Sequence, residues 1–413
     1  MLEDLFAAGP SLVALMLTTR CNFRCAYCYQ DRSAPRSMQL CVLEAAVDRF
    51  LRSDHSHPTL AFFGGEPLLE MSLVRRAVEI VRAETPTGMT PDLEISTNGV
   101  FLDEETARFL VEADVHITLS IDGLPGAQNQ RGPGSFDILD RLLVRFGRDH
   151  PGHLRTRFAV SVTLSSGNVS YLAGSFRYFV SRGVREIRVV PVFTHDSGWG
   201  LDARDELDRQ LADVVEESLK VHASSGEVWF QAFQPDGRET SGQAYAPSLC
   251  GTAGRKSLFV DMDGSLAPCG AMARSCLRDP PPLLRDAIET LGTFDLTDPD
   301  LAEKLAARER KVRDLPLLTG KTAKYSPFGR CGECPALLNC VICPASIAFS
   351  AGAAEPDRIP AIQCDFNRLI EKHRMAFHRA VSRANWPEAS EAEHRTRKVR
   401  MRSTQPVRPA DGS

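Results

Sequence analysis

Short apolar runs recur through residues 1–200, and a stretch with helical periodicity follows most of them. Apolar runs of this length, bounded by turn residues, predict buried β-strands, whereas apolar residues spaced three or four apart predict amphipathic helices. The predicted strands are residues 11–19, 59–65, 92–99, 115–123, 155–164 and 185–193. The predicted helices between them are residues 39–52, 70–83, 103–113, 135–148 and 169–182.

This alternation of strands and helices predicts a parallel sheet built from right-handed βαβ units. Six units are fewer than the eight of a closed TIM barrel, so the predicted fold class is α/β, with a partial (β/α)6 TIM-like barrel. Ligands of parallel α/β folds bind at the C-terminal ends of the strands. A Rossmann fold would need a glycine-rich loop after the first strand, but cysteines stand there instead.

The pattern changes after residue 200. Residues 202–222 read as one long amphipathic helix, regular structure thins from 250 onward, and residues 365–385 read as a closing helix. The sequence therefore predicts four parts: a barrel, a helical bridging region, a small irregular cysteine-rich domain and a disordered basic tail. Their ranges are 1–200, 201–249, 250–385 and 386–413.

Composition changes this picture little. The 413 residues are 43% hydrophobic and 25% charged, with a formal net charge of −4. These values are typical of a globular protein, and the near-neutral balance gives no nucleic-acid footprint. No apolar run approaches the roughly 20 residues of a membrane span, and the first ten residues lack the features of a signal peptide. We therefore expect a cytoplasmic protein with no membrane or nucleic-acid partner.

The twelve cysteines carry more information. In a reducing compartment they indicate metal or redox chemistry rather than disulfides. Three of them form a C-x3-C-x2-C trio directly after the first predicted strand, and none lies between 42 and 249. The trio comprises Cys21, Cys25 and Cys28, and Cys41 on an apolar helical face reads as a core thiol.

Three thiolates suit a [4Fe–4S] cluster whose fourth iron stays open to another ligand. An open position of this kind distinguishes a catalytic metal from a structural one. A zinc site completed by a distant residue is the alternative, but zinc sites are normally built from C-x2-C pairs.

The trio, with Tyr27 before its third cysteine, resembles the signature of the radical S-adenosylmethionine (SAM) enzymes. The resemblance implies a partial (β/α)6 barrel, with S-adenosyl-L-methionine chelated by the open iron. It also implies a 5′-deoxyadenosyl radical that abstracts a substrate hydrogen. "FFGGEP" resembles the family's GGE motif, which binds the amino group of S-adenosylmethionine and implicates Gly64, Gly65 and Glu66.

Two further segments match strand ends of this family. In "LSIDG", Ser120 would contact the S-adenosylmethionine carboxylate, and in "STNG", Ser96 or Asn98 would lie near substrate or ribose. Arg131 is a candidate second partner of that carboxylate. Ordinary turn and capping roles are the alternative for these four residues.

The later cysteines resemble the SPASM domain, which usually carries two auxiliary iron–sulfur clusters. By that resemblance the outer cluster would be held by Cys331, Cys334, Cys340 and Cys364. Cys250, Cys269 and Cys343 would give three ligands to the inner cluster, with Cys276 as either a fourth ligand or a bystander. A zinc ribbon of Cys331, Cys334, Cys340 and Cys343 is the structural alternative.

The resemblance implies an oxidoreductase-type radical SAM peptide maturase, which would place a thioether, carbon–carbon or related crosslink in a ribosomally made peptide. Alternatives are modification or decarboxylation of a small-molecule or peptide-derived cofactor precursor, and peptide epimerisation. Related sulfatase maturases carry an aspartate directly after the cysteine of the G-x4-C element, where this sequence has Gly270. The expected partners are a peptide or protein substrate, a flavodoxin- or ferredoxin-type electron donor and a separate precursor-recognition protein.

Overall fold

Six parallel strands form the first part of a curved sheet in the computed structural model, which describes residues 10–234, 257–277, 279–350 and 353–385. They pair in chain order, with registers such as Leu12 opposite Thr59 and Leu60 opposite Leu93. The strands are β1 (Leu12–Met16), β2 (Thr59–Phe63), β3 (Asp92–Thr97), β4 (His116–Ser120), β5 (Phe158–Leu164) and β6 (Glu186–Pro191). All six predicted strands are confirmed.

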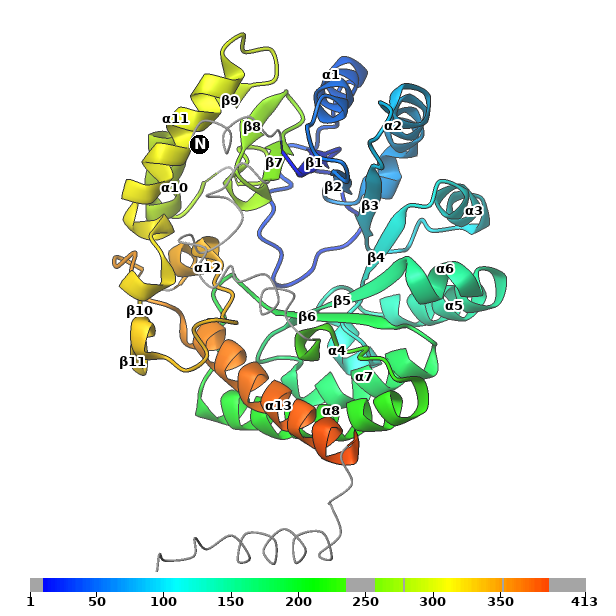
Figure 1. The fold of residues 1–413 in the computed structure, drawn as a ribbon, viewed down its shortest axis with the longest axis vertical. Helices are drawn as coiled ribbons and strands as arrows, with labels where there is room; N and C mark the ends of the chain where they lie inside the picture. The colour runs from blue at the N-terminus through cyan, green and yellow to red at the C-terminus, as the bar shows by residue number, and fades with distance from the viewer. Residues whose placement is uncertain (1–9, 235–256, 278, 351–352, 386–413) are drawn as a thin grey trace, which may run out of the picture.

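Helices cover the convex side of this sheet (Figure 1). The five predicted helices are confirmed as α1 (Leu40–Leu51), α2 (Met71–Glu84), α3 (Glu104–Glu112), α5 (Ser135–Asp149), and η3 (Val169–Tyr171) continued by α7 (Leu172–Ser181). Each packs one apolar stripe on the sheet, as Leu43, Val47 and Phe50 of α1 do. Short segments η2 (Pro67–Glu70), α4 (Pro125–Gln128) and α6 (Pro151–Thr156) fill the connections.

Cys41 does not belong to that core. The prediction of a core thiol is wrong, because Cys41 is exposed on α1. The buried stripe of α1 runs through Leu43, Val47 and Phe50, and position 41 lies off that stripe.

The sheet continues beyond the six predicted strands. β7 (Ser257–Val260) pairs in parallel with the free edge of β1, and β8 (Ser265–Ala267) and β9 (Phe294–Asp295) follow antiparallel. These strands have two to four residues, too few for a periodic pattern in the sequence. The cysteine-rich part of the chain therefore begins as an extension of the barrel sheet.

The remaining described elements surround the cysteines of the later region. They are η6 (Gly270–Met272), α10 (Pro282–Leu291), α11 (Leu301–Asp314), η7 (Pro316–Leu318), η8 (Lys321–Ala323), β10 (Tyr325–Ser326), β11 (Gly329–Arg330), η9 (Cys331–Glu333) and α12 (Pro344–Ala348). The predicted long and closing helices are α8 (Leu201–Ser225) and α13 (Ala361–Asn385), and η4 (Gln231–Phe233) follows α8. α8 and α13 lie side by side (Figure 1), joined where Asp208 accepts from Lys372 and contacts His373 at 2.6 Å.

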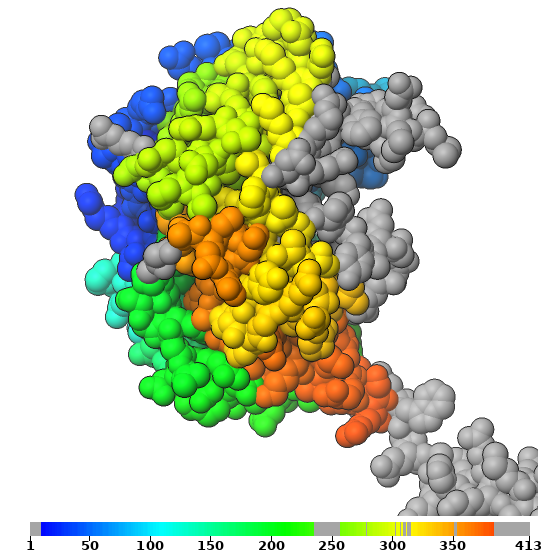
Figure 2. Space-filling view, turned by 90° about the vertical axis from the view of Figure 1, so that its left-hand side faces the viewer, coloured from blue at the N-terminus to red at the C-terminus, as the bar shows by residue number. Residues whose placement is uncertain are grey.

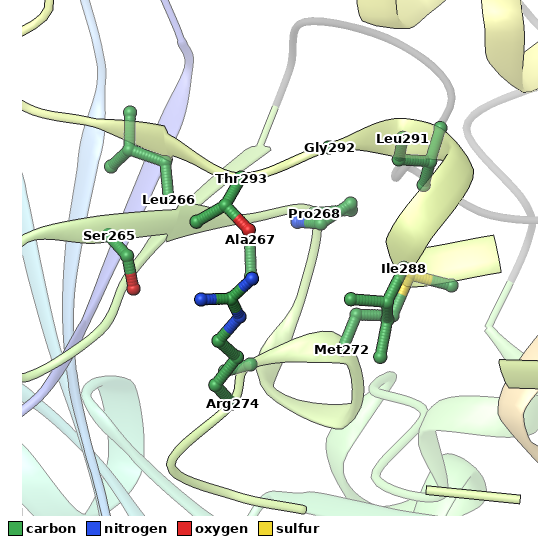
Figure 3. Close-up of a pocket in the computed structure, with 11 residues that line it drawn as sticks. Ser265, Leu266, Ala267, Pro268, Met272, Arg274, Ile288, Leu291, Gly292 and Thr293 are labelled. Carbon is green, nitrogen blue, oxygen red and sulfur yellow. The ribbon is translucent and has the colours of Figure 1, made fainter. Parts of the chain in front are cut away.

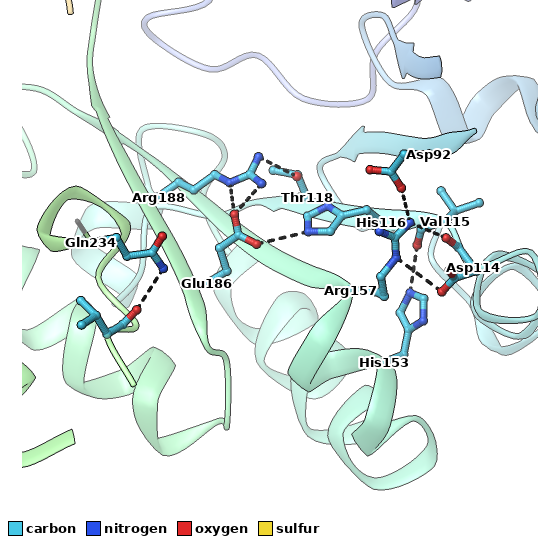
Figure 4. A network of polar contacts seen from close by, with 11 residues as sticks. Asp92, Asp114, Val115, His116, Thr118, His153, Arg157, Glu186, Arg188 and Gln234 are labelled. Carbon is cyan, nitrogen blue, oxygen red and sulfur yellow. Dashed lines mark hydrogen bonds and ion pairs between the residues drawn. The ribbon is translucent and has the colours of Figure 1, made fainter. Parts of the chain in front are cut away.

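Polar and charged side chains connect strands near the N-terminal ends of β4 and β6 (Figure 4). His116 of β4 lies 3.3 Å from a carboxylate oxygen of Glu186 in β6, and Arg188 donates to the same carboxylate at 2.6 Å. The hydrogen bond with His116 lowers the pKa of Glu186, and Arg188 adds to that effect against the penalty of burial. A network of hydrogen bonds thus links β4 and β6 at this end of the barrel.

None of the helices that the structure describes combines the length and the apolar character that a membrane span requires.

Lys324 organises the cysteine-rich part from within. Its ammonium is fully buried and donates to the carbonyls of Pro316, Leu317 and Pro356 and to the carboxylate of Asp357. Its own carbonyl accepts the Cys331 N–H at 2.9 Å. One lysine therefore joins three separate stretches of the chain, 316–317, 356–357 and the one that begins at Cys331.

We expect Lys324→Met to destabilise the protein by about 3 kcal/mol, because it leaves buried carbonyls without their donor. Lys311→Met is the matched control, since Lys311 is exposed and donates to one carbonyl, that of Thr290. That control should change stability by less than about 0.5 kcal/mol. Equal urea midpoints for the two variants would contradict this role of Lys324.

Candidate active site

The cysteine trio lies in the loop that connects β1 to α1. The two ends of this loop are paired, since Met38 N–H donates to Leu17 and Thr19 N–H donates to Arg36. Cys21, Cys25 and Cys28 are each half-buried between those ends.

The three thiols are close enough to influence one another. Burial raises the pKa of Cys25 to about 11, and the neighbouring Cys28 and Cys21 add to the rise, while Arg131 opposes it. The structure therefore brings the predicted trio together at the C-terminal end of β1. Among the described residues, no three Cys, His, Asp or Glu side chains already stand in the geometry that chelates a single metal ion.

The GGE segment after β2 holds this loop by its backbone. Gly65 N–H donates to the Thr18 carbonyl at 2.7 Å, and Glu66 N–H donates to the Arg20 carbonyl at 2.8 Å. A Cβ atom on Gly65 would lie 2.3 Å from the Arg20 carbonyl oxygen, and one on Gly64 would lie 2.7 Å from that of Thr18. Glycine is required here because the two backbones are in direct contact.

The Glu66 carboxylate turns into the protein. It is completely buried and accepts from Thr97 Oγ1 at 2.6 Å, Asn98 N–H at 2.7 Å and Leu68 N–H at 3.1 Å. Burial raises its pKa to about 7, and these three hydrogen bonds act in the opposite direction. Glu66 thus fastens the end of β2 to the end of β3.

A second set of buried side chains fastens the trio loop to β4 and β5. Tyr27 donates its hydroxyl to Asp122 at 2.5 Å, and Arg131 Nε donates to the same carboxylate at 2.9 Å. Arg131 also donates to the Ser161 carbonyl at 3.2 Å. Burial raises the pKa of the Tyr27 hydroxyl, which keeps it a neutral donor. The segment between Cys25 and Cys28 is anchored here.

The other predicted site residues divide into two groups. Asn98 is buried and donates to Asn22 at 2.7 Å, so it supports the trio loop, and its Nδ2 lies 3.8 Å from Cys21 Sγ. Ser96 is exposed and Ser120 is half-buried. By strand alternation both side chains lie on the concave face of the sheet.

The four cysteines predicted for the outer cluster are also neighbours. Burial raises the pKa of Cys331 to about 11, with Cys364 and Cys334 adding to the rise. Burial likewise raises the pKa of Cys340 to about 12, where Lys321 opposes the rise and Cys364, Cys331 and Cys334 increase it. Cys343 is half-buried before α12, and Cys250 lies outside the described residues.

Three consecutive residues after β6 lie between the trio loop and the helix that carries Cys364. After β6, Thr194 lies 3.4 Å from the Tyr27 carbonyl, and the ring of Phe193 lies 4.7 Å from that of Tyr29. The Val192 carbonyl accepts from Gln363, the residue before Cys364, at 3.2 Å. The segment 192–194 therefore contacts the trio loop on one side and the residue before Cys364 on the other.

Cys269 and Cys276 lie beside the same loop. Asp31 N–H donates to the Cys276 carbonyl at 2.7 Å. The Cys276 thiol is completely buried, with its sulfur 3.8 Å from Met16 Sδ. A Cβ atom on Gly270 would lie 3.1 Å from the Phe259 ring and 3.2 Å from the Tyr29 hydroxyl. A side chain at position 270 would therefore press on Tyr29 and Phe259.

A small cavity lies between β8, η6 and α10 (Figure 3). Its volume is about 20 Å³, and Arg274 extends across it toward Thr293 among Leu266, Met272 and Leu291. This volume holds about one water molecule, so the cavity is too small for a peptide or a nucleoside.

The cysteine-rich region forms one side of the molecule. In the space-filling view, the segments around residues 257–314 lie above those around 320–370, and both pack against the barrel (Figure 2). The two groups of thiols therefore belong to one packed body.

The comparisons with known proteins agree with this geometry. Residues 15–141 match the model of the radical SAM superfamily. The chain is 31% identical over 284 residues to a cysteine-type anaerobic sulfatase-maturating enzyme of Clostridium novyi, covering 63% of this chain and 73% of that enzyme. The chain belongs to the radical SAM superfamily.

Other relatives of this radical SAM enzyme are more distant. An uncharacterized protein of Methanocaldococcus jannaschii is 27% identical over 184 residues, which is 43% of this chain and 62% of that protein. The solved structure of native anSMEcpe with bound AdoMet has a TM-score of 0.67 at 19% identity, covering 91% of this chain and 100% of that one. Streptococcus suis SuiB bound to precursor peptide SuiA has a TM-score of 0.55 at 12% identity, covering 86% and 76%.

The residues of this radical SAM enzyme fit the cluster and the S-adenosylmethionine that its superfamily implies. Three thiols share one loop, and positive charge from Arg32 and Arg131 acts on them, as a set of thiolates requires. Gln30 donates to the Gly64 carbonyl at 3.2 Å, while its own Oε1 is buried without a hydrogen-bond partner among the described residues. An unfilled acceptor beside the GGE turn suits the ammonium group of the cofactor.

Sequence reasoning missed several residues of this site. In the "LSIDG" segment the sequence indicated Ser120 rather than Asp122. It is the Asp122 carboxylate, however, that accepts hydrogen bonds from both Tyr27 and Arg131. Tyr29 and Arg32 follow the trio without any motif of their own.

Gly65→Ala should destabilise the protein by about 3 kcal/mol, because the added Cβ atom overlaps the Arg20 carbonyl that the turn must touch. It should also lower the iron retained per chain. Gly152→Ala is the control, since a Cβ atom there meets nothing within 4 Å. Urea unfolding and iron content measure both effects, and a Gly65→Ala chain as stable as the control would contradict the contact.

Glu66 should make stability depend on pH. Its folded pKa of about 7 exceeds the ordinary 4.5, so the folded chain binds more protons between these values and loses stability as pH rises through them. The loss is about 3 kcal/mol and is complete above pH 7. Glu66→Gln should remove this dependence between pH 5 and pH 8, whereas Glu105→Gln, at an exposed position, should keep it. Parallel stability profiles for wild type and Glu66→Gln would refute the shift.

Proposed function

We propose that this radical SAM enzyme is a peptide maturase that oxidatively crosslinks a ribosomally made peptide, by a thioether, carbon–carbon or related bond. The observation that carries the proposal is the presence of two thiol groups, Cys21 to Cys28 and Cys331 to Cys364, with the segment 192–194 in contact with the trio loop and with Gln363, the residue before Cys364. An oxidative reaction must remove electrons from its substrate, and a second redox site in the same protein would serve that need. A redox-neutral epimerase needs it less.

The radical and redox chemistry would come from the cofactors expected in the site. When bound, S-adenosylmethionine and the trio cluster supply homolysis of a carbon–hydrogen bond, and two auxiliary clusters supply electron transfer. Cys21, Cys25 and Cys28 would hold the first cluster; the auxiliary ligands would be Cys331, Cys334, Cys340 and Cys364, with Cys250, Cys269 and Cys343.

The chain's own residues fix the position of these groups. Gly64 and Gly65 let the loop approach the cofactor's ammonium end, where the Gln30 Oε1 oxygen stands as acceptor. Tyr27, Asp122 and Arg131 hold the middle of the trio loop by buried hydrogen bonds. Ser96 and Ser120, on the concave face, would contact substrate and cofactor.

The relatives support a peptide or protein substrate. The curated relatives include cysteine-type and serine-type sulfatase-maturating enzymes, and SuiB is solved with a precursor peptide. Gly270 favours a different reaction from sulfatase maturation. A Cβ atom there would lie 3.2 Å from the Tyr29 hydroxyl, so an aspartate like that expected of those maturases would press on Tyr29.

The proposal includes a cytoplasmic enzyme with a flavodoxin- or ferredoxin-type electron donor and a separate precursor-recognition protein. It assigns residues 1–200 to the barrel, 201–249 to a bridging region and 250–385 to a SPASM domain. The basic tail, 386–413, lies outside the described residues.

Incubating the reconstituted enzyme with its cognate peptide, S-adenosylmethionine and reductant should give a product about 2 Da lighter, the loss of two hydrogens on forming one bond. The Cys25→Ser variant should give no product, whereas the Cys41→Ser variant, at an exposed thiol away from the trio, should be as active as wild type. High-resolution mass spectrometry measures the change. An unchanged mass with solvent deuterium incorporated would indicate epimerisation, and a loss of about 44 Da would indicate decarboxylation.

A further inference from the structure

Arg32 closes the trio loop at its sulfur atoms. It lies four residues after Cys28 and donates one N–H to the Cys28 sulfur at 2.9 Å and another to the Phe23 carbonyl. Phe23 lies between the first two cysteines, so one guanidinium contacts the loop on both sides of Cys25. In the described part of the chain, both hydrogen bonds that Arg32 donates stay within this loop.

The charge of Arg32 acts on all three thiols. Burial disfavours the charged guanidinium, but the hydrogen bond and charge of Cys28, with Cys21 and Cys25, outweigh burial and raise the pKa of Arg32. The second cation of the site is placed differently. Arg131 is paired with Asp122 at 2.9 Å, which offsets its charge.

We propose that Arg32 is a positioning residue that raises the reduction potential of the cluster held by the trio. Reduction adds one negative charge to the cluster, and a nearby cation with an N–H···S bond stabilises the more negative state. Hydrogen bonds to metal-bound sulfur tune redox centres in this way. Arg32 therefore eases transfer of one electron from the external donor to the cluster. The inference rests on the cluster of the proposed function but on no particular peptide.

Arg24 provides a matched control. It is an exposed arginine of the same loop, between Cys21 and Cys25. Solvent and salt screen an exposed charge far more than a half-buried one. Arg24→Gln and Arg32→Gln therefore remove the same charge from the same loop and differ in the contact with sulfur.

The experiment is a reductive titration of the full-length holoenzyme without peptide, followed by electron paramagnetic resonance. The part of the [4Fe–4S] signal that changes when S-adenosylmethionine is added reports the trio cluster alone. In Arg32→Gln we expect the ratio of reduced to oxidised cluster at a fixed potential to fall at least tenfold, a shift of about 59 mV for one electron. Arg32→Lys should shift less in the same direction, and Arg24→Gln should match wild type.

Iron and sulfide content of each variant separates tuning from loss of the cluster. If Arg32→Gln does not retain the cluster, the comparison is made with Arg32→Lys, because lysine keeps the positive charge but lacks the two separate guanidinium nitrogens that reach Cys28 and Phe23. A loaded Arg32 variant with the wild-type potential, or an equal shift in Arg24→Gln, would overturn the inference. Absence of any response to S-adenosylmethionine in the wild type would instead overturn the proposed function.

Discussion

The site depends on the direct contact between two backbones, the loop after β1 and the glycine turn after β2. Gly65 and Glu66 donate their N–H groups to carbonyls of that loop, and a Cβ atom at Gly65 would stand 2.3 Å from the Arg20 carbonyl oxygen. Because Cys21 is the next residue after Arg20, this contact sets where the first thiol stands. Backbone contact of this kind is possible only where side chains are absent.

Buried charge completes what the backbone contact begins. Glu66 joins the ends of β2 and β3, and Asp122 joins the trio loop to Arg131 and to the N–H of Thr163 in β5. Each carboxylate accepts several hydrogen bonds, which is the condition for burying such a group without a large loss of stability. These two carboxylates therefore hold the strand ends and the trio loop in fixed relative positions.

The sequence predicted the six barrel strands, their helices and the clustering of Cys21, Cys25 and Cys28, because apolar runs and cysteine spacing are local patterns. It did not predict that β7 extends the sheet beside β1, since four residues carry no period. It named Arg131 as a candidate partner of the cofactor carboxylate, which stays a prediction, but it did not predict the ion pair of Arg131 with Asp122. The roles of Tyr29 and Arg32 were also missed, because they depend on partners that only the folded loop brings near.

The segment after β6 explains why two distant cysteine groups lie at one end of the barrel. Parallel strands bring their C-terminal ends to one edge, so residues 192–194 emerge on the side where the trio loop leaves β1. Phe193 packs on Tyr29, and its ring also lies 5.9 Å from that of Phe349, which directly follows α12. The Val192 carbonyl meanwhile accepts from Gln363 of α13. The cysteine-rich region is therefore oriented by the edge of the sheet, which keeps the second group of thiols at the end of the barrel where the trio stands.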